Sequence, residues 1–447
     1  MVAGARVDLP QWFDQVRFGA YQLRAVALCF LVTTFDGFDT QAIAFTGPAL
    51  AQALGVGPRG LAPIVTAGVA GMALGAVLFG PLGDRYGRRA AVLLATAVFG
   101  IFSLLTAYAG SVEQLIVLRF LTGIGMGGAA PNVYTLASEF SPARHRGLIM
   151  LVAGLGLPVG AIVGGLIAGQ VIAAWGWPGV FIVGGVAPLL FLPLLWVLFP
   201  ESPYYLARRD RQPELRALLA RVAPTAAPRA DTVFTLPEAP TRVGPAALLS
   251  PELRHNTLAI WGTYFFNWVA WFALVLWIPS VLTAAGLPRD QAGLATVTLN
   301  GAALVFMLPL AWMLPRLPVQ RLILWLLAGA VVVSLLLAQA GSRWGLVFAL
   351  VGLSGLFVGG PQIALNYLAV SIYPTAVRAS GVGWAIGMGR IGTVVGGAAG
   401  GMVLEDFGPR GFFVALALPL LAAGLAALTV RRVEGQARAQ RREGCDS

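Results

Sequence analysis

Long apolar stretches alternate with short polar segments along the whole chain. A helix needs about 20 apolar residues to cross the hydrocarbon core of a bilayer. The pattern therefore predicts an all-α membrane protein with twelve transmembrane helices, at residues 24–50, 61–82, 90–109, 114–139, 147–172, 179–199, 257–285, 291–314, 321–340, 344–371, 379–402 and 411–430. Because the number of spans is even, we expect both termini on the same side of the membrane.

The composition agrees with a chain embedded in lipid. Of 447 residues, 58% are hydrophobic and 11% are charged, whereas soluble domains carry about 25% charged residues. Cys29 falls within the first span and Cys445 in the tail, so we expect no disulfide framework. The net charge of +11 comes from arginines that sit mainly between the spans, which indicates topology and not a nucleic-acid partner.

The positions of the arginines predict the orientation. If the N-terminus lies inside, only Arg59, Arg289, Arg343 and Arg410 of the 30 basic residues fall in outer loops. Cytoplasmic loops carry an excess of arginine and lysine in membrane proteins. We therefore expect a multi-pass protein of the plasma membrane, the inner membrane of a bacterium, with both termini in the cytoplasm.

A long polar segment divides the chain. We expect an N-terminal six-helix bundle at residues 1–199, a cytoplasmic central loop at 200–256, a C-terminal six-helix bundle at 257–430 and a cytoplasmic tail at 431–447. The middle of the central loop is rich in proline and alanine and is expected to be flexible. Residues 213–222, PELRALLARV, are predicted to form a short amphipathic surface helix.

The two halves of the chain repeat each other. When the sequence is shifted by 232, residues 121–147 lie over residues 353–379 without a gap. The aligned pairs include Gly123 with Gly355, Pro142 with Pro374, Arg146 with Arg378 and Gly176 with Gly408. Two parallel six-helix repeats are the architecture of major facilitator transporters, which work by alternating access.

The segment GPLGDRYGRR, residues 80–89, connects the second and third predicted spans on the inner side. It resembles the signature motif of the major facilitator superfamily, and the resemblance implies a role in conformational switching and not in substrate binding. We assign this role to Gly80, Asp84, Arg85, Gly87, Arg88, Arg89, Arg146 and Arg378. The alternative is an ordinary turn whose arginines only fix the topology.

Several glycines repeat at short spacing inside the spans. GIGMGG, at residues 123–128, formally matches a dinucleotide-binding motif, but such a site needs a preceding strand. Close packing of helices is the better explanation here, and also for Gly160, Gly164, Gly392 and Gly396.

Four charged residues, Asp36, Asp39, Arg119 and Arg390, fall inside predicted spans, and Glu139 lies near an inner end of one. A charge in the membrane interior costs about 2.5–3.5 kcal/mol on insertion scales. At a rise of about 1.5 Å per residue, Asp39 and Arg119 lie at similar depths, so we predict that they pair. This pair can serve an anionic substrate, or it can be a structural link between two helices.

The seventh predicted span is rich in aromatic residues. Tyr264, Trp268 and Trp271 share one helical face, where they can stack on a planar ligand. Alternatively, at least half of the aromatic residues in this span face lipid or form an interfacial belt. Asn267 aligns approximately with Asp36 in the repeat, so the acid is present in one half only.

The first span, around FDGFD at residues 35–39, resembles the first span of aromatic acid:proton symporters. Their D-G-[YF]-D pattern is present as Asp36, Gly37, Phe38 and Asp39, and the segments that begin at Arg119 and Tyr373 also resemble that family. The resemblance implies proton-coupled import of an aromatic carboxylate of the hydroxybenzoate or benzoate class. We predict proton coupling by Asp36, Asp39 and Glu139, and substrate binding by Arg119, Arg390, Tyr264, Asn267, Trp268 and Trp271.

The expected partners are an aromatic acid, protons and the lipid bilayer. We expect a transporter and not an enzyme, with no cofactor and no metal, that functions as a monomer. Three alternatives remain open from the sequence: a proton symporter of a non-aromatic organic acid, a proton-antiporting exporter, and, last, a sensor or membrane enzyme.

Overall fold

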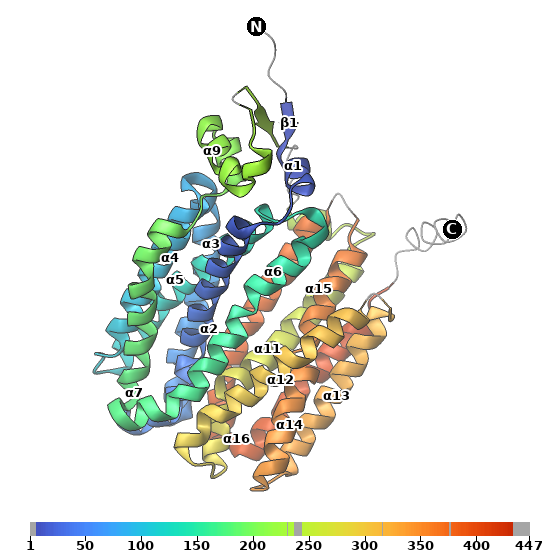
Figure 1. Ribbon diagram of the computed structural model, residues 1–447. Helices are drawn as coiled ribbons and strands as arrows, with labels where there is room; N and C mark the ends of the chain where they lie inside the picture. The colour runs from blue at the N-terminus through green and yellow to red at the C-terminus, as the bar shows by residue number, and fades with distance from the viewer. Residues whose placement is uncertain (1–5, 230, 237–243, 315, 375–376, 432–447) are drawn as a thin grey trace. The chain divides into compact units, whose positions relative to one another are not determined.

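The computed structural model describes residues 6–229, 231–236, 244–314, 316–374 and 377–431 (Figure 1). Contacts between Cα atoms divide the chain into two units. The first unit comprises Met1–Ala239 and Ile278–Asn300, and the second comprises Pro240–Trp277 and Gly301–Ser447. The domain boundaries that the sequence suggests at residues 199, 256 and 430 stay predictions.

Helices account for most of the described chain. The first part of the chain forms α1 (Leu9–Gln15), α2 (Ala20–Leu54), α3 (Pro58–Tyr86), α4 (Arg88–Thr106), α5 (Val112–Glu139), η1 (Ala143–His145), α6 (Arg146–Gly154), α7 (Gly156–Leu198), α8 (Pro203–Arg208), α9 (Gln212–Val222) and η2 (Pro224–Ala226). The later part forms α10 (Pro245–Leu248), α11 (Arg254–Ala284), η3 (Arg289–Gln291), α12 (Ala292–Met313), α13 (Val319–Gln339), α14 (Trp344–Phe357), α15 (Pro361–Ile372) and α16 (Arg378–Leu428).

Two of the longest helices are each interrupted by one glycine. Gly176 in α7 has φ 69° and ψ −173°, and Gly408 in α16 has φ 65° and ψ −174°. Glycine adopts positive φ readily because it has no Cβ. Each break separates two of the predicted spans, 147–172 from 179–199 and 379–402 from 411–430. Eight helical stretches in the described chain are long and apolar enough to cross a membrane, and two of them contain these breaks.

Glycines allow the helices of the first unit to approach closely. A Cβ on Gly71 of α3 would lie 2.1 Å from the carbonyl oxygen of Phe120 in α5, and one on Gly127 of α5 would lie 1.9 Å from that of Met72. The same holds for α2 and α7, where a Cβ on Gly160 would lie 1.9 Å from the carbonyl oxygen of Thr34. The close packing that the sequence predicted for Gly127 and Gly160 is confirmed, and it fixes α5 and α2 next to their neighbours.

Glycines also allow α11 and α16 of the second unit to approach closely. A Cβ on Gly392 would lie 2.3 Å from the carbonyl oxygen of Phe265, and one on Gly396 would lie 2.3 Å from that of Val269. Further along, the indole Nε1 of Trp277 donates to the carbonyl oxygen of Gly397 at 2.9 Å. These contacts hold the aromatic face of α11 against α16.

A small subdomain at one end of the first unit joins the start of the chain to the central segment. The strand β1 (Arg6–Asp8) pairs in parallel with β2 (Val233–Thr235). Helices α1 and α9 lie beside these strands (Figure 1). Trp12 and Phe13 of α1 belong to one apolar core with Leu219 of α9 and Phe234 of β2. The predicted helix at residues 213–222 is confirmed as α9. The strand β2 lies in a segment that the sequence suggested to be flexible. It is ordered there because it pairs with β1 at the start of the chain.

Candidate functional site

Arg119 and Asp39 form a buried ion pair inside the first unit. The guanidinium Nη1 lies 2.8 Å from Asp39 Oδ2, and the two side chains are 2% and 0% exposed. Asp39 Oδ1 accepts a further hydrogen bond from the hydroxyl of Ser103 on α4. Both carboxylate oxygens are therefore satisfied, as a buried charge requires. The pairing that the sequence predicted between these residues is confirmed.

The other contacts of the Arg119 guanidinium do not use all of its hydrogen-bond donors within the described chain. Its guanidinium lies 5.5 Å from the centre of the Phe181 ring, within the range of a cation–π contact. Its Nε is buried and has no hydrogen-bond partner in the described part of the chain. Arginine offers five N–H donors in a planar fork. An anion of matching shape can therefore gain a donor that Asp39 does not use.

Asp36 lies one turn before Asp39 on α2 and is also buried, with 1% exposure. The hydroxyl of Thr40 donates to Asp36 Oδ1 at 3.2 Å. The ion pair with Arg119 is formed by Asp39, whereas Asp36 accepts a hydrogen bond from a hydroxyl on its own helix. Neutralising Asp36 leaves the Arg119 charge paired, whereas neutralising Asp39 does not.

Glu139 belongs to a different place in the structure. It is the last residue of α5, 20 positions after Arg119, which corresponds to about 30 Å along the helix axis. Its Oε2 accepts a hydrogen bond from the hydroxyl of Ser202. The structure therefore brings Asp36, Asp39 and Arg119 together on neighbouring helices and does not bring Glu139 to them. Proton coupling through Glu139 stays a prediction.

An aromatic cluster with one arginine lies in the second unit. The Arg390 guanidinium sits 5.3 Å from the centre of the Trp268 ring. The Trp268 ring in turn packs on Gly389, where a Cβ would come within 2.8 Å of it. Trp271 packs against Gly359 in the same way, at 2.9 Å. The structure thus joins Trp268 and Arg390 directly, as a flat surface beside a positive charge.

Two polar side chains of this cluster have no hydrogen-bond partner among the residues that the structure describes. Asn267 is fully buried, and neither its amide oxygen nor its amide nitrogen is hydrogen-bonded within the described chain. The same is true of the indole Nε1 of Trp268. Tyr264, in contrast, donates to Asn366 Oδ1 at 2.7 Å. Buried polar groups are normally satisfied, so Asn267 and Trp268 offer a donor and acceptor set to a bound ligand.

The signature segment forms a network at the end of the first unit that carries the N-terminus. Asp84 and Arg88 form an ion pair, and Arg88 also donates to Asn132 Oδ1 at 3.3 Å. The backbone N–H of Arg89 donates to Glu201 Oε1 at 3.2 Å. Gly87 has φ 102°, and a Cβ there would lie 2.2 Å from Glu201 Oε2.

Glu201 and Ser202 are members of this network that the sequence did not single out. Glu201 Oε1 also accepts from the Ser202 N–H at 2.8 Å, and burial raises the pKa of Glu201 above its ordinary value. The available signal was the segment PESPYYLARR, which begins at Pro200. Gly87 and Arg89, which Glu201 contacts, lie more than 100 positions earlier in the chain, so the sequence does not indicate that they are neighbours.

The two remaining arginines assigned to switching begin equivalent helices. Arg146 starts α6 and Arg378 starts α16. Arg378 Nε donates to the carbonyl oxygen of Tyr373 at 3.2 Å. In the described residues, no group of three or more histidine, cysteine, aspartate or glutamate side chains is placed to hold a metal ion.

Comparison with known proteins gives concordant matches. A family model described as Major Facilitator Superfamily matches residues 29–288 and 260–444. The gallate transporter of Pseudomonas putida is 37% identical over 430 residues, covering 95% of this chain and 95% of that protein. The 4-hydroxybenzoate transporter PcaK of Pseudomonas putida is 36% identical over 407 residues, covering 90% of each. A crystal structure of a D-xylose-proton symporter matches with a TM-score of 0.73 and 18% identity, over 92% of this chain and 97% of that one.

Proposed function

This chain belongs to the major facilitator superfamily, and we propose that it imports an aromatic carboxylate together with protons by alternating access. Two relatives of similar length are transporters of gallate and of 4-hydroxybenzoate. The proposed substrates are accordingly benzoates, hydroxybenzoates among them. The observation that carries the proposal is the buried Asp39–Arg119 pair, because a guanidinium with an unused donor is a receptor for a carboxylate.

The aromatic ring of the substrate requires a different surface. Trp268 presents an indole beside the Arg390 guanidinium, and both tryptophan and arginine stack on aromatic rings. Asn267 next to it has a free amide oxygen and nitrogen within the described chain, which suit the hydroxyl groups of a phenolic acid. We propose that Tyr264 and Trp271 complete this surface. Arg119 and Arg390 are thus the two candidate partners of the substrate carboxylate, one in each unit.

Proton coupling is assigned to the two acids of α2. Asp36 accepts a hydrogen bond from the Thr40 hydroxyl, and a proton on Asp36 leaves the ion pair between Asp39 and Arg119 intact. Asp39 instead compensates Arg119 when no substrate is bound. We propose that Asp36 carries the proton and that Asp39 keeps Arg119 neutralised until the substrate carboxylate arrives.

The direction of transport depends on the proton gradient. A monovalent carboxylate that moves with one proton carries no net charge, so only the pH difference drives it. If two protons move, the membrane potential contributes about 2.3 kcal/mol per charge per 100 mV. We propose that the protein lies in the bacterial inner membrane with both termini in the cytoplasm and works as a monomer; the inner-facing arginines support the orientation.

Uptake by the purified protein in proteoliposomes tests this function. With the vesicle interior alkaline, we expect accumulation of 4-hydroxybenzoate, gallate or benzoate, and little uptake of aliphatic acids such as succinate. Empty vesicles and vesicles containing the Arg119→Ala variant are the controls. Uptake that follows a sodium gradient and ignores pH would overturn the proton coupling. Preference for aliphatic acids would overturn the aromatic assignment. Movement of the substrate only in the direction opposite to that of the protons would identify an exporter.

A further inference from the structure

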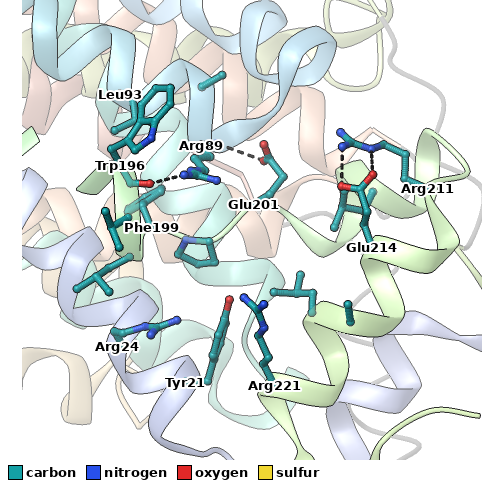
Figure 2. A pocket seen from close by; sticks show the side chains of 17 residues that line it. Tyr21, Arg24, Arg89, Leu93, Trp196, Phe199, Glu201, Arg211, Glu214 and Arg221 are labelled. Carbon is teal, nitrogen blue, oxygen red and sulfur yellow. Dashed lines mark hydrogen bonds and ion pairs between the residues drawn. The ribbon is translucent and has the colours of Figure 1, made fainter. Parts of the chain in front are cut away.

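A cavity lies in the first unit, away from the buried ion pair. It has a volume of about 560 Å³ and lies between the start of α2, the start of α4, the end of α7 and helix α9 (Figure 2). Arg24 in its wall precedes Asp39 by 15 positions on α2, or about 22 Å along the axis. The predicted spans 24–50 and 179–199 end here, so the cavity opens at the level of the membrane surface.

The cavity is basic. Figure 2 shows Arg24 and Arg221 on either side of Tyr21, with Arg89 on the facing wall. All three guanidinium groups are close enough to act electrostatically on Tyr21. Arg24 stacks on the Tyr21 ring at 4.4 Å. Among the described residues, none of the three forms an ion pair with a carboxylate, although Arg89 lies near enough to Glu201 to act on it electrostatically.

The acids of the cavity are already engaged. Glu214 forms an ion pair with Arg211 at 2.5 Å, and Glu201 Oε1 accepts two backbone hydrogen bonds. Arg89 donates to the carbonyl oxygen of Trp196, and its Nε is buried without a hydrogen-bond partner in the described chain. A bound anion would therefore meet guanidinium donors and would not be repelled by a free carboxylate at the same point.

The rim of the cavity on α7 is apolar and exposed. Trp196 is 65% exposed and Val197 is 75% exposed, at the end of a helix that crosses the membrane. Tryptophan is enriched at the interface between lipid and water. The cavity thus combines a basic interior with an apolar edge that continues into the lipid, which a small soluble anion does not need.

We propose that this cavity binds the headgroup of an anionic phospholipid, with the phosphate between Arg24, Arg89 and Arg221 and the acyl chains along the exposed side of α7. Basic pockets at the ends of transmembrane helices recognise such headgroups by charge. Arginine binds the phosphate oxygens through two parallel hydrogen bonds. The cavity shares no residue with the buried ion pair or the aromatic cluster, although Arg89 belongs to both the cavity and the signature segment.

Native mass spectrometry of the full-length protein in detergent tests the proposal. The protein is titrated with dioleoyl-phosphatidylglycerol and, in parallel, with zwitterionic dioleoyl-phosphatidylcholine. We expect preferential binding of phosphatidylglycerol, and about 30-fold weaker binding of it to the Arg24→Gln/Arg221→Gln variant, since each arginine near a membrane surface contributes about fivefold. Arg221→Gln alone changes only α9, outside the spans, and should weaken binding about fivefold.

The matched control is Arg144→Gln/Arg254→Gln, which removes two exposed arginines elsewhere and should leave the affinity unchanged. Equal binding of the two lipids by the wild-type protein would overturn the proposal. So would an unchanged phosphatidylglycerol affinity in both cavity variants, or an equal loss in the control. Displacement of the lipid by inorganic phosphate or glycerol 3-phosphate at equal concentration would identify a soluble phosphate ligand instead, and would also overturn it.

Discussion

Arg119 on α5 holds Asp39 on α2 at two points, because Nη1 lies 2.8 Å from the carboxylate and Nη2 lies 3.1 Å from the backbone carbonyl oxygen of the same residue. The fork of the guanidinium makes this double contact possible, and an ammonium group cannot reproduce it. Removing one partner of a buried ion pair costs about 3–5 kcal/mol, because the other charge is left uncompensated. Substitution of either residue is therefore expected to have a measurable effect.

We expect the Arg119→Lys variant to insert into the membrane but to transport poorly. Lysine keeps the charge opposite Asp39 but loses the planar fork, so the affinity for the carboxylate should fall about tenfold or more. The initial rate of 4-hydroxybenzoate uptake as a function of concentration gives this value. Arg343→Lys, at an exposed position, is the control. Wild-type uptake by Arg119→Ala would contradict a role of this residue in substrate binding.

Neutralising Asp36 and neutralising Asp39 should have different effects on transport. Asp36→Asn is expected to abolish proton-driven accumulation while exchange of substrate for substrate continues. Asp39→Asn should reduce both activities, because it leaves the Arg119 charge without its partner. Uptake against a gradient and counterflow are measured for each variant at equal protein amounts. Full accumulation by Asp36→Asn would refute the proton-carrier role, and equal loss of both activities in both variants would indicate a structural cluster.

Asn267 offers a way to distinguish binding from folding. Its side chain is fully buried and makes no hydrogen bond in the described chain, so the Asn267→Ala variant loses no intramolecular bond. We expect little change in thermal unfolding of the purified protein and an increase of about tenfold in KM, equivalent to one hydrogen bond of about 1.4 kcal/mol. The control is Asn300→Ala, whose amide donates to the carbonyl oxygen of Thr296 at 3.0 Å. A lower unfolding temperature for Asn267→Ala with unchanged KM would assign Asn267 a structural role.

Much of the fold could be predicted because it follows from local pattern. Apolar stretches give the spans, and the repeat at a shift of 232 aligns Gly176 with Gly408, which then prove to have the same backbone conformation. The pairing of Asp39 with Arg119 was also accessible, since helix rise gives depth and lipid excludes unpaired charges.

The rest depends on contacts between distant segments. Nothing near Val233 indicates that it pairs with Arg6, because the strand has only three residues and its partner lies at the other end of the first unit's sequence. Ser103 is one of many serines, and its contact with Asp39 follows from the packing of α4. Lateral packing between helices, unlike depth, is not encoded in hydropathy.

The close contact between α3 and α5 should make Gly127 intolerant of a side chain. A Cβ at this position would lie 1.9 Å from the carbonyl oxygen of Met72, and backbone cannot move aside without separating the helices. We expect Gly127→Ala to destabilise the purified protein by about 1–3 kcal/mol. Gly147→Ala is the control, because a Cβ there meets nothing within 4 Å. Unfolding temperatures in the same detergent provide the comparison, and equal values for the two variants would contradict the packing.

Glu201 should make stability depend on pH. Burial raises the pKa of Glu201 above its ordinary value of 4.5, although hydrogen bonds from Ser202 and Arg89 partly oppose the shift. A raised pKa means that the folded protein binds this proton more tightly than the unfolded chain does. The contribution of this group to stability is therefore largest at low pH and is lost as the pH rises from 4.5 through the raised pKa.

The Glu201→Gln variant isolates this effect. Both backbone hydrogen bonds go to Oε1, which a glutamine oxygen can replace, so the variant removes the charge and keeps the contacts. We expect the unfolding temperature of the wild type to fall relative to that of Glu201→Gln as the pH rises through this window. Glu252→Gln, at an exposed position, is the control and should run parallel to the wild type. If Glu201→Gln also runs parallel, Glu201 keeps an ordinary pKa in the folded protein and its carboxylate is better solvated than its burial implies.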